Sequence, residues 1–156
     1  MEGVAGAIVA GMAVYGVLCI VWYIIMVIAD WKIFTKAGEA GWKSLIPILN
    51  TYVLFKISWK GSMFWIMLLT LFGGSACTSL AGDNGGMLQI AGLILSVIGL
   101  LITLIDVHKL SKSFGHGIGF TLGLLFLNPL FTLILAFGSS KYIGPEGKGT
   151  GFTDEQ

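Results

Sequence analysis

Four long runs without a charged residue dominate the pattern of polar and apolar positions along the chain. They cover residues 3–29, 61–82, 84–105 and 117–140. The apolar core of a bilayer is about 30 Å thick and needs about 20 helical residues to cross it. A spanning backbone must satisfy its own hydrogen bonds, which favours helix. The pattern predicts an all-α integral membrane protein with four transmembrane helices, at about 4–29, 61–82, 85–106 and 117–138.

A fifth apolar run, 44–55, is too short to cross the bilayer. On a helical wheel its polar residues share one arc, and most apolar residues lie opposite. The members of the polar arc are Lys43, Ser44, Pro47, Asn50, Thr51 and Ser58. Trp42 and Trp59 stand at the two ends. This pattern predicts one short amphipathic interfacial helix at about 43–58.

Composition agrees with a membrane protein. The chain is 56% hydrophobic and 11% charged, whereas soluble domains are about 25% charged. These values argue against a cytosolic enzyme, a secreted module and a nucleic-acid-binding protein. Cys19 and Cys77 lie in apolar runs and are expected to be buried thiols. The sequence predicts no metal, no cofactor and no catalytic residue.

The lysines orient the predicted spans. With four spans, the loops 30–60 and 106–116 lie on one side of the membrane. They carry Lys32, Lys36, Lys43, Lys56, Lys60, Lys109 and Lys112, while Lys141 and Lys148 lie on the other side. The positive-inside rule then predicts Lys-rich loops in the cytoplasm and both termini outside. We expect these loop lysines, with Trp42 and Trp59, to contact anionic lipid at the interface.

The exits from the first and third spans resemble each other. Residues 30–42 and 106–120 both contain Asp, two Lys, Gly and then Gly-aromatic, and each precedes an apolar segment with Pro and Asn. The likeness suggests a parallel two-fold internal repeat. Gly38 and Gly115 are predicted to end the two helices as C′ residues.

Several local features refine these predictions. Pro129 should kink the fourth run, and a re-entrant hairpin turning at Asn128-Pro129 is the alternative. Asp106 is expected to pair with Lys109, three residues later on the same helix. Asp83-Asn84-Gly85-Gly86 has the composition of a tight turn. The transmembrane domain is assigned to 1–143, and 144–156 to a flexible polar tail.

Motifs in both halves of the chain resemble those of a known family. The first reads Lys36-Ala37-Gly38-Glu39-Ala40-Gly41-Trp42 and is followed by Pro47 and Asn50. The later ones are Leu110 to Phe120 and Ala136-Phe137-Gly138-Ser139-Ser140-Lys141-Tyr142, with Ala136 where Gly is usual. They resemble an uncharacterised family of small bacterial membrane domains, some of whose members are labelled as, or fused to, signal peptidase I. The resemblance covers residues 20–143 and implies a bacterial inner-membrane protein.

Two function hypotheses come from the small and polar residues. Small residues recur every four positions at Gly3, Ala7 and Gly11, at Gly92 and Ser96, and at Gly119 and Gly123. Such faces let membrane helices pack closely, within one chain or between chains. The first hypothesis is a non-enzymatic packing or accessory protein that binds itself or another membrane protein. The second is a small pore or transporter in which Asn50 and Asn128 line a polar path. A membrane enzyme ranks behind both, because no nucleophile–base pair stands out.

Overall fold

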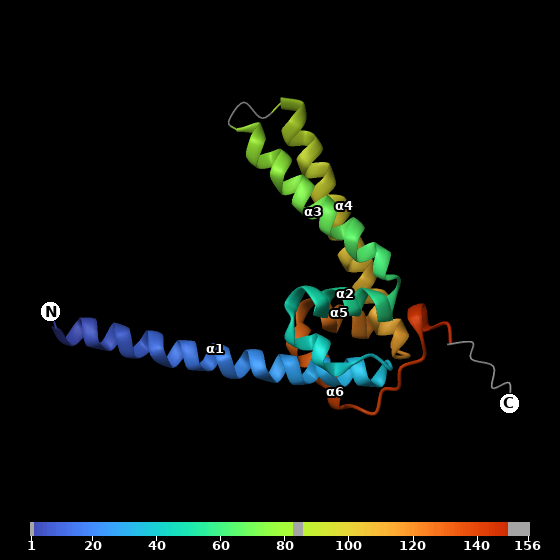
Figure 1. Cartoon of the computed structure of the whole chain (residues 1–156), viewed down its shortest axis with the longest axis horizontal. Coiled ribbons are helices and arrows are strands. Elements are labelled where there is room, and N and C mark those ends of the chain that lie inside the picture. The colour runs from blue at the N-terminus through green and yellow to red at the C-terminus, as the bar shows by residue number, and fades with distance from the viewer. Residues whose placement is uncertain (1, 83–85, 150–156) are drawn as a thin grey trace.

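The computed structural model describes residues 2–82 and 86–149, and every element in this part of the chain is helical. The elements are α1 (Glu2–Lys36), η1 (Gly41–Leu45), α2 (Pro47–Ser58), α3 (Gly61–Ala81), α4 (Gly86–Ser113), α5 (Ile118–Phe126), α6 (Asn128–Phe137) and η2 (Pro145–Gly147). Two arms extend from a common body, one formed by α1 and the other by the antiparallel pair α3 and α4 (Figure 1). The body contains η1, α2, α5, α6, η2 and the ends of α1, α3 and α4 nearest to them.

Three helices are long and apolar enough to cross a membrane: Gly6–Lys36, Gly61–Ala81 and Gly86–Ser113. The prediction of four spans is not confirmed, because the run 117–138 is divided into α5 and α6. Helices of 9 and 10 residues are about 14–15 Å long, roughly half the thickness of the bilayer core. Neither is long enough to cross alone.

The break between α5 and α6 is a sharp turn, as in the predicted alternative of a re-entrant hairpin. Leu127 leaves helical geometry (φ −124°, ψ 43°), and α6 then begins with Pro129 in its first turn. Proline is tolerated there because its missing N–H would have no helical partner. The rings of Phe120 and Phe131 lie 5.0 Å apart across the hairpin. Gly123 permits this approach, because a Cβ at that position would overlap the Phe131 ring.

The hairpin begins and ends at the same place in the molecule. His116, just before α5, and Ser140, just after α6, are joined by a hydrogen bond of 2.7 Å between Nε2 and Oγ. The chain therefore returns to the body instead of continuing away from it.

Two helix ends are built alike, as predicted for Gly38 and Gly115. Both glycines have φ of 76°. The amide of Glu39 donates to the Phe34 carbonyl, and the amide of His116 donates to the Ser111 carbonyl, which is the Schellman pattern. The internal repeat itself is not confirmed, because η1 and α2 follow the first end, whereas the α5–α6 hairpin follows the second.

Glycines bring α3 and α4 into close contact. A Cβ on Gly74 would lie 2.8 Å from the Gly92 carbonyl oxygen and against the Ser96 hydroxyl, and Gly99 faces Leu71 in the same way. Gly92 and Ser96 therefore pack within the chain. A Cβ added to Gly3, Gly11 or Gly119, in contrast, would meet no atom within 4 Å.

The main core lies in the body. Its buried members come from α1, α2, α4 and α6, with Phe114 from the segment after α4. They are Ala29, Ile33, Phe34, Val53, Ile57, Leu110, Phe114, Leu135 and Ala136. Cys19 is exposed on the α1 arm, contrary to its predicted burial, and Cys77 is half-buried; both are free thiols.

Part of the predicted tail is also packed. Residues 144–149 include η2, which lies against the end of α4. Residues 150–156, and Asp83, Asn84 and Gly85 of the predicted turn, lie outside the described residues.

Candidate functional site

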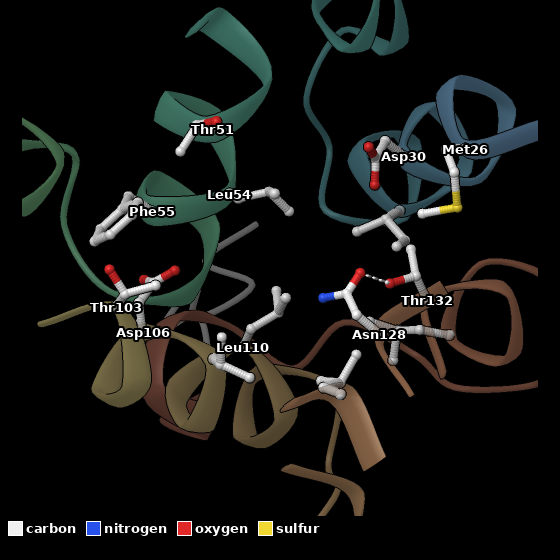
Figure 2. Close-up of a pocket in the computed structure, with 14 residues that line it drawn as sticks. Met26, Asp30, Thr51, Leu54, Phe55, Thr103, Asp106, Leu110, Asn128 and Thr132 are labelled. Atoms are coloured by element: carbon white, nitrogen blue, oxygen red, sulfur yellow. Dashed lines mark hydrogen bonds between the residues drawn. The ribbon is translucent and has the colours of Figure 1, made fainter. Parts of the chain in front are cut away.

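A cavity of about 220 Å³ lies where the α1 arm and α4 enter the body. Its walls come from α1, α2, α4, α5 and α6, so it is enclosed partly by the hairpin (Figure 2). Its polar lining residues are Asp30, Thr51, Thr103, Asp106, Asn128 and Thr132. Apolar side chains, among them Ile33, Leu110 and Leu124, form the rest of the wall.

Asp106 is the most buried acid of the cavity, with 6% of its surface exposed. The Ser58 hydroxyl donates to its Oδ1. The predicted pair with Lys109 is wrong, because the Lys109 ammonium instead pairs with Glu146 and lies over the Trp59 ring. Asp106 and Lys109 are three residues apart on α4 and could contact each other, but Lys109 pairs with Glu146, which lies much further along the chain.

Asp30 is held from α2. The Asn50 amide donates to Asp30 Oδ2 at 2.7 Å. The polar arc predicted for this region faces inward, since Asn50 and Ser58 bond the two cavity acids, Thr51 lines the cavity and Ser44 is buried. The buried acids provide hydrogen-bond partners for these side chains. If α2 lay on the membrane surface with its polar side outward, these partners would be out of reach. The exposed apolar residues lie near the start of α2 and just before it, and they are Trp42, Leu45, Ile46 and Ile48.

The hairpin contributes Asn128, the first residue of α6. The Thr132 hydroxyl donates to its Oδ1 at 3.4 Å. Figure 2 shows the Asn128 amide nitrogen pointing into the cavity. Asn128 therefore lines the same cavity as Asp30. Asn50 bonds Asp30 but does not itself line the cavity.

The predicted interface lysines surround the body and are mostly engaged with acids, carbonyls or rings. Lys43 and Lys56 both pair with Glu39, at 2.6 and 2.5 Å. Burial alone would raise the pKa of Glu39, but hydrogen bonds from these two lysines outweigh it and hold the pKa below its usual range. Lys36 donates to the carbonyls of Leu135 and Gly138. Lys32 lies 4.3 Å from the centre of the Phe137 ring, while Lys60 and Lys112 are exposed.

The segment after α6 is tied to the same body. The Tyr142 hydroxyl donates to the Ile57 carbonyl at 2.8 Å, and the Ile143 amide donates to the Ser113 carbonyl at 2.7 Å. Burial raises the pKa of Tyr142 to about 12. Glu146 pairs with Lys109 and Lys148.

We expect the Glu146 ion pairs to persist in mild acid. Hydrogen bonds from Lys109 and then Lys148 lower the pKa of Glu146 to about 2 from an ordinary value of 4.5. Because the pKa is lower in the folded protein, ionised Glu146 stabilises the packing of residues 144–149 above pH 4.5. This stabilisation is lost as the pH falls from 4.5 towards 2. In a variant that keeps Trp59 alone of the five tryptophans, the fluorescence should respond to movement of Lys109 and should therefore stay constant from pH 7 to about 5. Glu146→Gln should change that fluorescence at pH 7 and speed tryptic cleavage after Lys148 by about two- to fivefold. A spectral transition above pH 5 that Glu146→Gln abolishes would contradict this assignment.

Sequence reasoning finds some members of the cavity and misses the site as a whole. It indicates Asn50 and Asn128 for a polar path, and it places Asp30 and Asp106 at matching positions of the two exits. It does not identify Ser58, Thr103 and Thr132 as site residues, since hydroxyls in apolar helices are common and carry no distinctive spacing. Within the described residues, no three His, Cys, Asp or Glu side chains come together as metal ligands.

Comparison with known proteins places the chain in a family. Residues 42–145 match a family of unknown function, DUF5684. The chain belongs to this family. The DUF5684 match includes α2 to α6 and leaves out the α1 arm, and it carries no link to signal peptidase I. No curated protein and no solved structure matches the chain.

Proposed function

We propose that this DUF5684 protein is a non-enzymatic accessory protein of the bacterial cytoplasmic membrane, which assembles with a second copy of itself through α1. The observation that carries the proposal is the lack of packing along the α1 arm. α1 packs on η1, α2 and α6 through its C-terminal part, and within the described residues its backbone does not come close to that of α3 or α4. Its outer part remains uncovered, with Tyr15 and Ile20 exposed by 70% and 61%.

The distribution of glycine supports the second copy as the partner. Three glycines of α3 and α4 lie in the contact between these two helices, namely Gly74, Gly92 and Gly99. Gly3, Gly6, Gly11 and Gly16 on α1 instead have open space around them. Glycine in a helix costs about 1 kcal/mol relative to alanine, and close approach of another helix is the usual compensation in membranes. Parallel α1 helices related by a two-fold axis would present the same small-residue face to each other.

We further propose that the N-terminus lies outside and the described C-terminal segment lies in the cytoplasm. With three spans and a returning hairpin, all nine lysines fall at the body end of the molecule and none on the arms. With four spans, seven lysines would lie on one side of the membrane and two on the other. With three spans all nine lie on one side, so the positive-inside bias is stronger. The exposed Lys60, Lys112 and Lys141 would face anionic headgroups, each contributing about 1 kcal/mol near the membrane surface.

The cavity favours a second candidate, a solute-binding or transport protein. Carboxylates inside a membrane domain are expensive to bury and usually serve a function.

The pairing of Ser140 with His116 has the distance of a nucleophile–base pair. We assign it a structural role, because it closes the hairpin and neither residue lines the cavity.

Disulfide trapping tests the assembly. In a Cys19→Ser, Cys77→Ser background, Ala7→Cys should form a disulfide-linked dimer when membranes are oxidised. Val9→Cys lies about 200° further around the helix and serves as the matched control. Gly11→Leu should lower the yield of the Ala7→Cys dimer, because its side chain would hold the helices apart, and Val9→Leu should not. Equal trapping of Ala7→Cys and Val9→Cys, or no trapping of either, would contradict the α1 interface.

A further inference from the structure

Two acidic residues line the cavity, one from α1 and one from α4. Neither Asp30 nor Asp106 forms a salt bridge with any described residue, and their partners are the neutral Asn50 and Ser58. The lysines on the same helices are directed elsewhere. Lys109 pairs with Glu146, Lys36 bonds two carbonyls, and Lys32 lies over Phe137. An ionised carboxylate in such a buried place needs a counter-ion, and a cationic ligand would supply it.

The second observation is that nearly every polar group on the cavity wall is a hydrogen-bond acceptor. The Thr51 and Thr103 hydroxyls donate to the carbonyls of Pro47 and Gly99, one turn earlier on their helices. The Thr132 hydroxyl donates to Asn128 Oδ1. Each threonine proton is thus committed, and each threonine oxygen remains available as an acceptor.

Asp106 adds the most buried acceptor. Ser58 occupies only Oδ1, and Oδ2 makes no hydrogen bond within the described residues. The Asn128 amide nitrogen is the donor that faces the same space (Figure 2). A wall of acceptors fits a ligand that brings several N–H donors and a positive charge.

The size of the cavity and the composition of its wall favour an organic cation over an inorganic one. A volume of about 220 Å³ holds several water molecules, far more than a dehydrated metal ion needs. Ile33, Phe55, Leu110 and Leu124 offer a surface for hydrocarbon instead of further oxygen ligands. Cavities that are mostly apolar with a few placed polar groups are typical of small organic ligands.

We propose that the cavity binds a small organic ammonium ion, with its nitrogen at the carboxylate of Asp106, Asp30 as the second charged acceptor, and its alkyl part against the apolar walls. Figure 2 shows the two acids on opposite sides of the space that the ligand would fill. The site belongs to one chain and does not depend on assembly through α1.

Calorimetry on the full chain in lipid nanodiscs tests the proposal, with n-butylammonium as the probe. Binding should saturate at one per chain with a dissociation constant in the millimolar range or tighter, an affinity suited to so small a ligand. n-Butanol, which has the same hydrocarbon but no charge, should bind at least about tenfold more weakly. Potassium chloride at equal ionic strength should not compete beyond general screening.

Variants locate the binding in the cavity. Asp106→Asn and, separately, Asp30→Asn should each weaken n-butylammonium binding by about tenfold or more, since each removes a charge from the wall. Leu124→Phe should weaken it by filling the space while both acids remain. Glu39→Gln removes an acid outside the cavity whose partners, Lys43 and Lys56, do not line the cavity either, and it should leave the affinity unchanged.

The proposal is overturned if n-butylammonium shows no saturable binding, if n-butanol binds equally well, or if potassium competes as a specific ligand. It is also overturned if Asp30→Asn and Leu124→Phe both retain the parent affinity, even where Asp106→Asn does not fold. Failure of Ala7→Cys trapping would not affect this result, because the cavity is formed within one chain.

Discussion

Replacing Gly123 by leucine should destabilise the protein by about 1–3 kcal/mol, the usual cost of overfilling a packed site. A Cβ at Gly123 would overlap the ring of Phe131, which also packs edge-on against Phe120 at 5.0 Å. The α5–α6 hairpin cannot close as observed unless Phe131 moves. The expected result is a lowered midpoint of thermal unfolding in detergent, monitored by tryptophan fluorescence.

Gly119→Leu is the matched control for this prediction. Gly119 lies one turn earlier on α5, and a Cβ added there would meet no atom within 4 Å. Both substitutions gain the same helix propensity, close to 1 kcal/mol over glycine, so their difference reports the contact with Phe131. Phe131→Ala should be less harmful in the Gly123→Leu background than alone, because the two positions share one space. Equal stability of Gly123→Leu and Gly119→Leu would mean that the hairpin is not packed as described.

The three long helices were accessible from sequence because a membrane span depends on the length of an uncharged run. The runs 61–82 and 84–105 contain most of α3 and α4, and the continuation of α4 to Ser113 agrees with the helix end predicted at Gly115. The helix ends at Gly38 and Gly115 were also accessible, since a positive φ and the next few residues determine the motif.

The run 117–140 shows where such counting fails. Its apolar length does not distinguish one span from two half-length helices. The local signals were present, since Pro129 lacks an amide donor and Gly123 lacks a side chain. Their meaning depends on Phe131 and Phe120 meeting across the turn, and on Ser140 meeting His116. These contacts are tertiary, and spacing along the chain does not predict them.

The cavity was not predicted from the sequence either, because it too depends on contacts between residues far apart in the chain. Asn50 and Asp30 are 20 residues apart, and Ser58 and Asp106 are 48 apart. The wheel of residues 43–58 correctly separates polar from apolar positions, yet it does not say whether the polar arc meets headgroups or buried acids. Helix packing decides that question, because α2 lies against both α3 and α4.

The second large prediction concerns the sidedness of the chain after α6. The Gly138 carbonyl accepts from Lys36 at 2.8 Å, and Ile143 bonds Ser113, so this segment meets the ends of α1 and α4. We expect it to lie on the same side of the membrane as those ends, which the nine lysines place in the cytoplasm. Four spans would instead place it outside, together with the far ends of α3 and α4. The two arrangements differ by the whole thickness of the membrane.

Cysteine labelling in spheroplasts measures this difference directly. In a Cys19→Ser, Cys77→Ser background, Leu80→Cys marks the far end of α3, where Leu80 is 79% exposed. Ser139→Cys marks an exposed position just after α6. A membrane-impermeant maleimide should label Leu80→Cys in intact spheroplasts and Ser139→Cys only after lysis. Labelling of both positions before lysis would contradict the returning hairpin and restore four spans.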